Sequence, residues 1–278
     1  MSSRSKTLPP WVILSLATNA VLSLTVSLLL LQHSEWTSVG QAEASVTEQT
    51  SDSPEEVESE LGPRHQLTYE EWVEILEREA QAIATAPPER LSVLAGDSIA
   101  LWFPAELLPS DTTWLNQGIS GETTDGLFER LKLLDDTNPE AIFVSIGIND
   151  LIRGVEDEVL LDNYWRIIRD LREHHPDAQI IVHSILPHSG ENATWEGRDR
   201  LLELSNDRIR ELNRELEQLA EAEGAKYLNL SPLLTDENGN LDLDFTTDGL
   251  HLNEQGYLVW RSALQLYRDL ELANAPIE

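Results

Sequence analysis

The stretch Leu91–Ile99 reads LSVLAGDSI and decides the fold. Its first five residues are apolar apart from one serine, which predicts a short buried strand. Gly96 ends this run, and Ser98 follows at the predicted start of a helix. Backbone amides at a helix start favour negative charge, so a serine there is suited to nucleophilic attack. A helix cap formed by Asp97 or Ser98 is the simpler interpretation of this stretch taken alone.

The chain after this stretch alternates between strand and helix patterns. Further short apolar runs lie at 113–116, 141–146, 179–184 and 226–230. Helical patterns occupy about 122–135, 156–174, 200–223 and 254–272. This alternation predicts an α/β domain with a five-stranded parallel sheet covered by helices on both faces. The continuous apolar strands agree with that, because such strands are buried on both faces.

The N-terminal region has a different composition. Residues 11–31 contain no charged residue and are long enough for a single transmembrane helix. Arg4 and Lys6 precede them, so we expect residues 1–10 in the cytoplasm and the bulk of the chain outside the membrane. A cleaved signal peptide is the alternative, since Ala42–Ala44 resembles a cleavage site.

Two further segments precede the strand–helix domain. Residues 32–66 are rich in Glu, Ser, Thr and Gln and almost free of Lys and Arg, which predicts a disordered acidic tether. The sequence TYEE at 68–71 is a capping box, so residues 67–88 are predicted to form an amphipathic helix. Residues 89–278 then form the main domain.

The overall composition excludes several classes of function. The formal net charge of −31 argues against nucleic acid as a partner, because phosphate binding requires a basic surface. The absence of cysteine excludes disulfides, thiol nucleophiles and thiolate metal sites. The seven histidines have no spacing that indicates a metal site. The many carboxylates are compatible with glycosidase chemistry, but no particular pair supports it.

Polar clusters follow four of the predicted strands or the loops after them. Because the carboxyl ends of parallel strands meet at one sheet edge, we expect these clusters to lie together. His251 is the candidate base that would activate Ser98, and Asp248 would orient the imidazole. A serine nucleophile also needs donors for the oxyanion. The candidates for that role are the amides of Ser98 and Gly118 and the side chain of Asn149.

The motif blocks resemble those of the SGNH (GDSL-type) hydrolase family in order and spacing. The blocks are GDSI at 96–99, Gly118, GIND at 147–150 and DGLH at 248–251. The resemblance covers about residues 90–272, and its one departure is Ile99, where the family name has Leu. It implies a flavodoxin-like three-layer α/β/α sandwich with a five-stranded parallel sheet.

The resemblance also implies a function. The chain would be a membrane-anchored serine hydrolase that cleaves acyl or acetyl esters of lipids or carbohydrates through an acyl-enzyme. Its triad would be Ser98, Asp248 and His251, its oxyanion hole Ser98, Gly118 and Asn149, and it would need no metal or other cofactor. The alternative is a catalytically silent protein of the same fold that binds a glycan or lipid at the membrane.

Other residues near the motifs have simpler interpretations. Ser120 lies in a near match to G-x-S-x-G, but Glu122 replaces the final glycine, so we interpret Ser120 as a turn residue. Asp97 and Asp150 are expected to hold loop backbone at least as much as to act chemically. The irregular segment 187–199 is expected to shape substrate choice.

Overall fold

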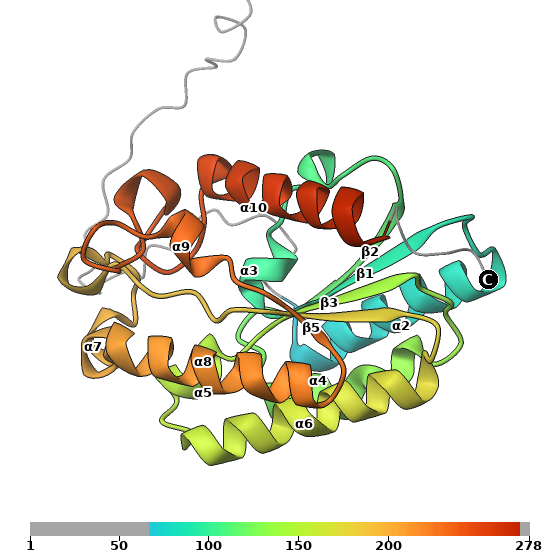
Figure 1. The fold of residues 1–278 in the computed structure, drawn as a ribbon, viewed down its shortest axis with the longest axis horizontal. Helices are drawn as coiled ribbons and strands as arrows, with labels where there is room; N and C mark the ends of the chain where they lie inside the picture. Colours follow the sequence, from blue (N-terminus) through green and yellow to red (C-terminus); the bar gives the residue numbers. More distant parts are fainter. Residues whose placement is uncertain (1–66, 273–278) are drawn as a thin grey trace, which may run out of the picture. The chain divides into compact units, whose positions relative to one another are not determined.

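The computed structural model describes residues 67–272, whose centre is a five-stranded parallel sheet (Figure 1). The strand order is β2-β1-β3-β4-β5. The strands are β1 (Leu91–Gly96), β2 (Thr113–Gly118), β3 (Ala141–Ser145), β4 (Gln179–His183) and β5 (Lys226–Leu228). All four neighbouring pairs are parallel, so the prediction of a five-stranded parallel sheet is confirmed.

Helices cover both faces of this sheet (Figure 1). One face carries α4 (Thr124–Arg130), α6 (Asp157–His174) and α8 (Asn206–Ala222), which pack side by side. The other face carries α3 (Ser98–Leu101) and α10 (Glu254–Tyr267). The short helical segments are α5 (Ile148–Ile152), α7 (Arg198–Glu203), α9 (Ser231–Leu234), η2 (Ala105–Leu107), η3 (Leu131–Leu134), η4 (Gly190–Asn192), η5 (Leu243–Phe245) and η6 (Arg268–Leu272).

The helix α2 (Tyr69–Thr85) packs against the edge strand β2. It begins with the predicted capping box: Thr68 Oγ1 accepts from the Glu71 amide at 3.3 Å, and Glu71 Oε2 accepts from the Thr68 amide at 2.8 Å. The Gln117 side chain of β2 donates to the Leu76 carbonyl at 3.3 Å. Caps of this kind stabilise a helix by about 1 kcal/mol, so α2 has both a fixed start and a tertiary anchor.

One predicted helix is divided in the structure. The pattern over 200–223 forms α7 and α8, which are separated at Leu204 and Ser205. Leu204 adopts an extended conformation, and the Ser205 side chain caps the new helix by accepting from the Asp207 amide at 3.0 Å. Apolar periodicity continues across this break, which is why the sequence pattern predicted one helix.

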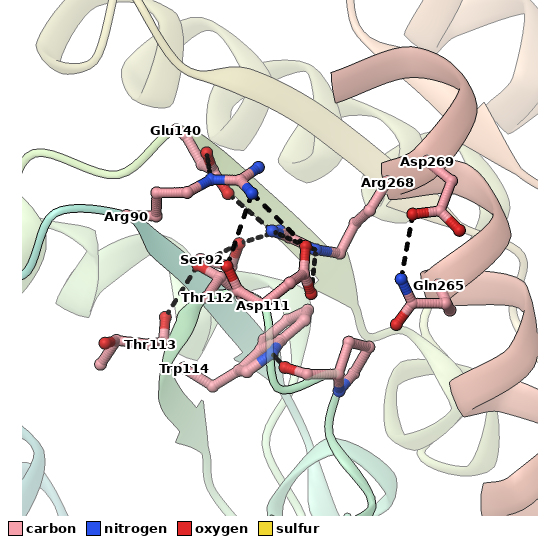
Figure 2. Close-up of polar contacts among 11 residues, drawn as sticks. Arg90, Ser92, Asp111, Thr112, Thr113, Trp114, Glu140, Gln265, Arg268 and Asp269 are labelled. Atoms are coloured by element: carbon pink, nitrogen blue, oxygen red, sulfur yellow. Dashed lines mark hydrogen bonds and ion pairs between the residues drawn. The ribbon is translucent and has the colours of Figure 1, made fainter. Parts of the chain in front are cut away.

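A buried arginine fixes the C-terminal end of the domain to the sheet (Figure 2). Arg268 is 1% exposed and donates to Asp111 at 2.8 Å, to Glu140 at 2.9 Å and to Ser92 Oγ at 2.6 Å. Arg90 joins the cluster through Glu140 at 2.9 Å. Ser92 lies at the start of β1, so this cluster lies at the amino ends of the strands, whereas the GDSI motif lies at their carboxyl ends.

The N-terminal predictions fall outside the part of the chain that is described. They are the cytoplasmic segment 1–10, the membrane anchor at 11–31 and the tether at 32–66. Among residues 67–272, no helix combines the length and the apolar character needed to cross a membrane.

Candidate active site

The turn between β1 and α3 places a serine hydroxyl at the carboxyl edge of the sheet. Asp97 caps α3, since its Oδ1 accepts from the Ile99 amide at 2.9 Å, and Ser98 is the first helical residue. The cap and the candidate nucleophile are therefore neighbouring residues rather than competing interpretations. Gly96 is required where the chain enters the turn, because a Cβ there would lie 2.1 Å from the Ser145 carbonyl oxygen.

Three of the predicted site residues form one hydrogen-bonded chain. Ser98 Oγ lies 3.0 Å from His251 Nε2, and His251 Nδ1 lies 2.8 Å from Asp248 Oδ2. Ser98 and His251 are both buried. These distances fit a proton path from hydroxyl to imidazole, with the carboxylate fixing the tautomer of the ring.

The Asp248 turn is held by its own backbone. Asp248 Oδ1 accepts from the amides of Leu250 at 2.9 Å and His251 at 2.8 Å. Thr246 Oγ1 donates to the His251 carbonyl at 2.5 Å and accepts from the Gly249 amide at 2.8 Å. Burial raises the pKa of Asp248, but the hydrogen bonds from His251 and from these amides outweigh it and lower the pKa below its usual value. Asp248 is therefore a carboxylate at neutral pH.

The segment 187–199 makes backbone contacts with this turn. The amides of Thr194 and Trp195 donate to the Asp248 carbonyl at 2.7 and 2.9 Å. Gly249 has φ of 89°, and a Cβ there would lie 2.5 Å from the Cα of Ala193. The backbone contacts explain the irregular shape of the segment, while its role in substrate choice stays a prediction.

One predicted oxyanion donor is already occupied. The Gly118 amide donates to Asn116 Oδ1 at 3.0 Å, so the expectation that this amide faces the substrate does not match the structure. Gly118 has a packing role instead, because a Cβ there would lie 2.3 Å from the Leu101 nitrogen. By contrast, the Ser98 amide donates to no group among the described residues.

A second glycine in the same loop has the free amide. Gly121 has φ of 74°, in the left-handed region, and its amide donates to no group within residues 67–272. Its carbonyl accepts from Arg153 at 2.6 Å. The Asn149 side chain donates to the Glu122 carbonyl at 3.0 Å, which leaves its second N–H available and places Asn149 beside the Gly121–Glu122 part of the loop.

A buried ion pair supports this loop from below. Glu122 and Arg130 are 2.9 Å apart, with side-chain exposures of 4% and 5%. Arg130 also donates to the Gly96 carbonyl at 3.1 Å, and the Tyr69 hydroxyl of α2 donates to Glu122 at 3.2 Å. The pair therefore links the loop after β2, the strand that leads to Ser98, and α2. Burial lowers the pKa of Arg130, although Glu122 opposes the shift.

The two other motif carboxylates are buried behind the site. Asp150 accepts from the Thr124 amide at 3.0 Å and from its hydroxyl at 2.5 Å, which fixes the loop as predicted. Burial raises the pKa of Asp97 to about 7, and the charges of Asp150 and Glu122 add to this rise against the Ile99 hydrogen bond. Neither carboxylate bonds to Ser98 Oγ or His251, so both act on the backbone.

The remaining candidate residues lie elsewhere. Ser120 is exposed, and in the described part of the chain no histidine lies within hydrogen-bond distance of its hydroxyl. His183 is buried between Phe143 and Trp260. Across residues 67–272, no group of three or more His, Asp or Glu side chains could hold a metal ion.

Sequence reasoning missed one aromatic neighbour of the site. The Trp102 ring lies 4.3 Å from the His251 ring, centroid to centroid, at an interplanar angle of 37°. Trp102 ends α3, and no periodicity distinguishes it from other aromatic residues. Its position follows from the tertiary approach of α3 to the Asp248 turn.

Sequence relatives with two different names match parts of the chain. An arylesterase from Vibrio mimicus is 30% identical over 122 residues, which are 38% of this chain and 60% of that protein. An N-acylneuraminate cytidylyltransferase from Streptococcus agalactiae is 25% identical over 183 residues, or 65% of this chain. The matched region is only 39% of the length of that cytidylyltransferase.

A solved structure and a family sequence model extend the likeness to most of the described residues. A Streptococcus pneumonia protein, provisionally described as a platelet activating factor, is 29% identical with a TM-score of 0.63, over 70% of this chain and 91% of its own. A sequence model of the GDSL-like lipase/acylhydrolase family matches residues 93–259. That match covers more than half of the chain and contains every motif block described above. The chain belongs to the GDSL-like lipase/acylhydrolase family.

Proposed function

We propose that this enzyme hydrolyses carboxylic esters with Ser98 as nucleophile, His251 as general base and Asp248 as the orienting carboxylate. The observation that carries the proposal is the hydrogen-bonded chain from Ser98 Oγ through His251 to Asp248, at 3.0 and 2.8 Å. A serine hydroxyl is a weak nucleophile until a neighbouring base accepts its proton. The family membership supports the same class of reaction.

The reaction has two stages. Ser98 Oγ attacks the ester carbonyl carbon while His251 Nε2 accepts the hydroxyl proton, and the protonated ring then donates that proton to the leaving alcohol oxygen. This gives an acyl-enzyme. Water then attacks the acyl carbon with His251 again acting as base, which releases the acid and restores Ser98. Asp248 remains ionised and stabilises the imidazolium in both stages.

The oxyanion would be stabilised by Ser98, Gly121 and Asn149. We assign the second backbone donor to Gly121 and not to Gly118. The Gly118 amide already donates to Asn116, whereas the Gly121 amide has no acceptor in residues 67–272. Two backbone amides and one side-chain amide are a donor set that suits a tetrahedral intermediate of acyl transfer.

Active-site labelling tests the assignment. A fluorophosphonate probe should label the wild type, and Ser98→Ala should lose both the labelling and the hydrolysis of p-nitrophenyl acetate. Ser120→Ala is the matched control and should keep both. Labelling that persists in Ser98→Ala would refute the nucleophile. Tight binding of a glycan or lipid by a wild type that hydrolyses no ester would instead favour a catalytically silent binding protein.

We also propose that residues 11–31 anchor the enzyme in a membrane with its catalytic domain on the extracytoplasmic side. The support is the uncharged stretch and the basic residues that precede it. Physiological substrates would then be esters of lipids or carbohydrates outside the cytoplasm. In intact cells, added protease should digest the catalytic domain. A domain that becomes accessible only after lysis would contradict this orientation.

A further inference from the structure

A groove of about 900 Å³ runs along the edge strand β2. It lies between α2, the edge strand β2 and the segment from α3 to η2. Most of its lining is apolar, and its larger members are Trp72, Ile75, Ile83, Trp102, Phe103 and Trp114. One wall is α2, which lies outside the region 93–259 that the family model matches. A groove of this size and character is typical of small-molecule sites.

The groove adjoins the catalytic residues at Trp102, and Asn116 links its lining to α3. Trp102 lines it, and the ring of Trp102 packs on the His251 ring at 4.3 Å. Asn116 also lines it, and its side chain holds the Ala100 carbonyl of α3 at 2.7 Å. Both residues lie on or against the short helix that begins with Ser98. A molecule that extends from the groove past Trp102 would therefore meet the site on its His251 side.

The chemistry of the reaction says which part of an ester lies on that side. His251 must donate a proton to the leaving oxygen, so the alcohol portion lies next to its ring. The oxyanion donor Asn149 is held elsewhere, against the Glu122 carbonyl. Resting on the proposed function, we propose that this groove binds the apolar alcohol portion of the ester substrate. Glu106 also lines the groove and disfavours an anionic tail, which points to an uncharged alkyl or aryl alcohol.

Two ester series test whether the groove binds the alcohol side or the acid side of the scissile bond. In the first, the acyl group is acetyl and the alcohol lengthens from methyl to decyl. In the second, the alcohol is methyl and the acid lengthens over the same range. Burial of one methylene group corresponds to about a two- to fourfold rise in kcat/KM in an open groove. We expect that rise in the alcohol series and a flat response in the acid series.

Substitutions on α2 test the location. From Trp72 to Ile83 the helix rises about 16 Å, so positions along it sample different depths of the groove. Ile75→Trp should end the rise at short alcohols, and Ala82→Phe, which adds a ring at an exposed position further along, should end it only at long ones. Gln81→Phe is the matched control, because Gln81 is exposed and does not line the groove.

The outcomes separate this inference from the proposed function. Two results would overturn the groove assignment while ester hydrolysis stands. One is a rise of kcat/KM with chain length in the acid series. The other is a rise in the alcohol series that is as steep in Ile75→Trp and Ala82→Phe as in Gln81→Phe. Full activity of Ser98→Ala on methyl acetate would refute the proposed function itself. A response confined to the alcohol series, truncated in Ile75→Trp before Ala82→Phe, is the result expected.

Discussion

Asp97→Asn should change how the stability of the domain depends on pH. Asp97 is 2% exposed, and burial together with the charges of Asp150 and Glu122 raises its pKa from 3.8 to about 7. The folded protein therefore holds this proton more tightly than the unfolded chain. Its stabilising contribution is complete below about pH 4 and is lost as the pH rises through about 7. Three units of pKa correspond to about 4 kcal/mol, of which about 3 kcal/mol is lost between pH 5 and pH 8.

Urea denaturation of the wild type and Asp97→Asn at pH 5 and pH 8 measures this contribution. The amide keeps an oxygen for the Ile99 hydrogen bond at 2.9 Å but cannot ionise. The wild type should lose about 3 kcal/mol more than the variant between the two pH values, a shift of roughly 1 M in urea midpoint. The difference cancels other titrations that the two proteins share. Equal losses in both proteins would show that Asp97 does not titrate in this range.

Two further substitutions test the oxyanion donors and the ion cluster. Asn149→Ala should lower kcat about 100- to 1000-fold with a much smaller change in KM, because the lost donor acts mainly in the transition state; a loss confined to KM would argue for substrate binding alone. Arg268→Met should lower the free energy of unfolding by about 3 kcal/mol, since it leaves Asp111 and Glu140 without their buried cation. The matched variant Arg90→Met, at a side chain 39% exposed, should cost less than about 1 kcal/mol, and equal costs in urea denaturation would contradict the reasoning.

The sheet was predictable because its buried strands can be recognised from their own short sequences. β1 and β3 are buried at every position, so their sequences are continuous apolar runs. The break between α7 and α8 was not predictable in the same way. Ser205 acts as a cap only because Leu204 leaves the helix, and a serine within an amphipathic pattern does not reveal that by itself.

The candidate site also has one part that the sequence predicts and one part that it does not. The order of the motif blocks was enough to predict that Ser98, Asp248 and His251 would meet, since the ends of parallel strands share one edge. Which glycine amide remains free depends on a side-chain rotamer. Asn116 Oδ1 accepts from the Gly118 amide two residues on, a contact that Asn commonly makes in turns but that the sequence NQGISGE does not by itself guarantee.

The helix α2 contacts both the groove and the loop after β2 that carries Gly121. Its first residue, Tyr69, bonds to Glu122, whose carbonyl in turn accepts from Asn149. Its middle is fixed to β2 through the side chain of Gln117. A displacement of α2 would therefore alter the groove wall and remove a support from the loop that carries Gly121. If the proposed groove and oxyanion donors are right, the residues that support activity extend beyond the family-matched region 93–259 to the helix that precedes it.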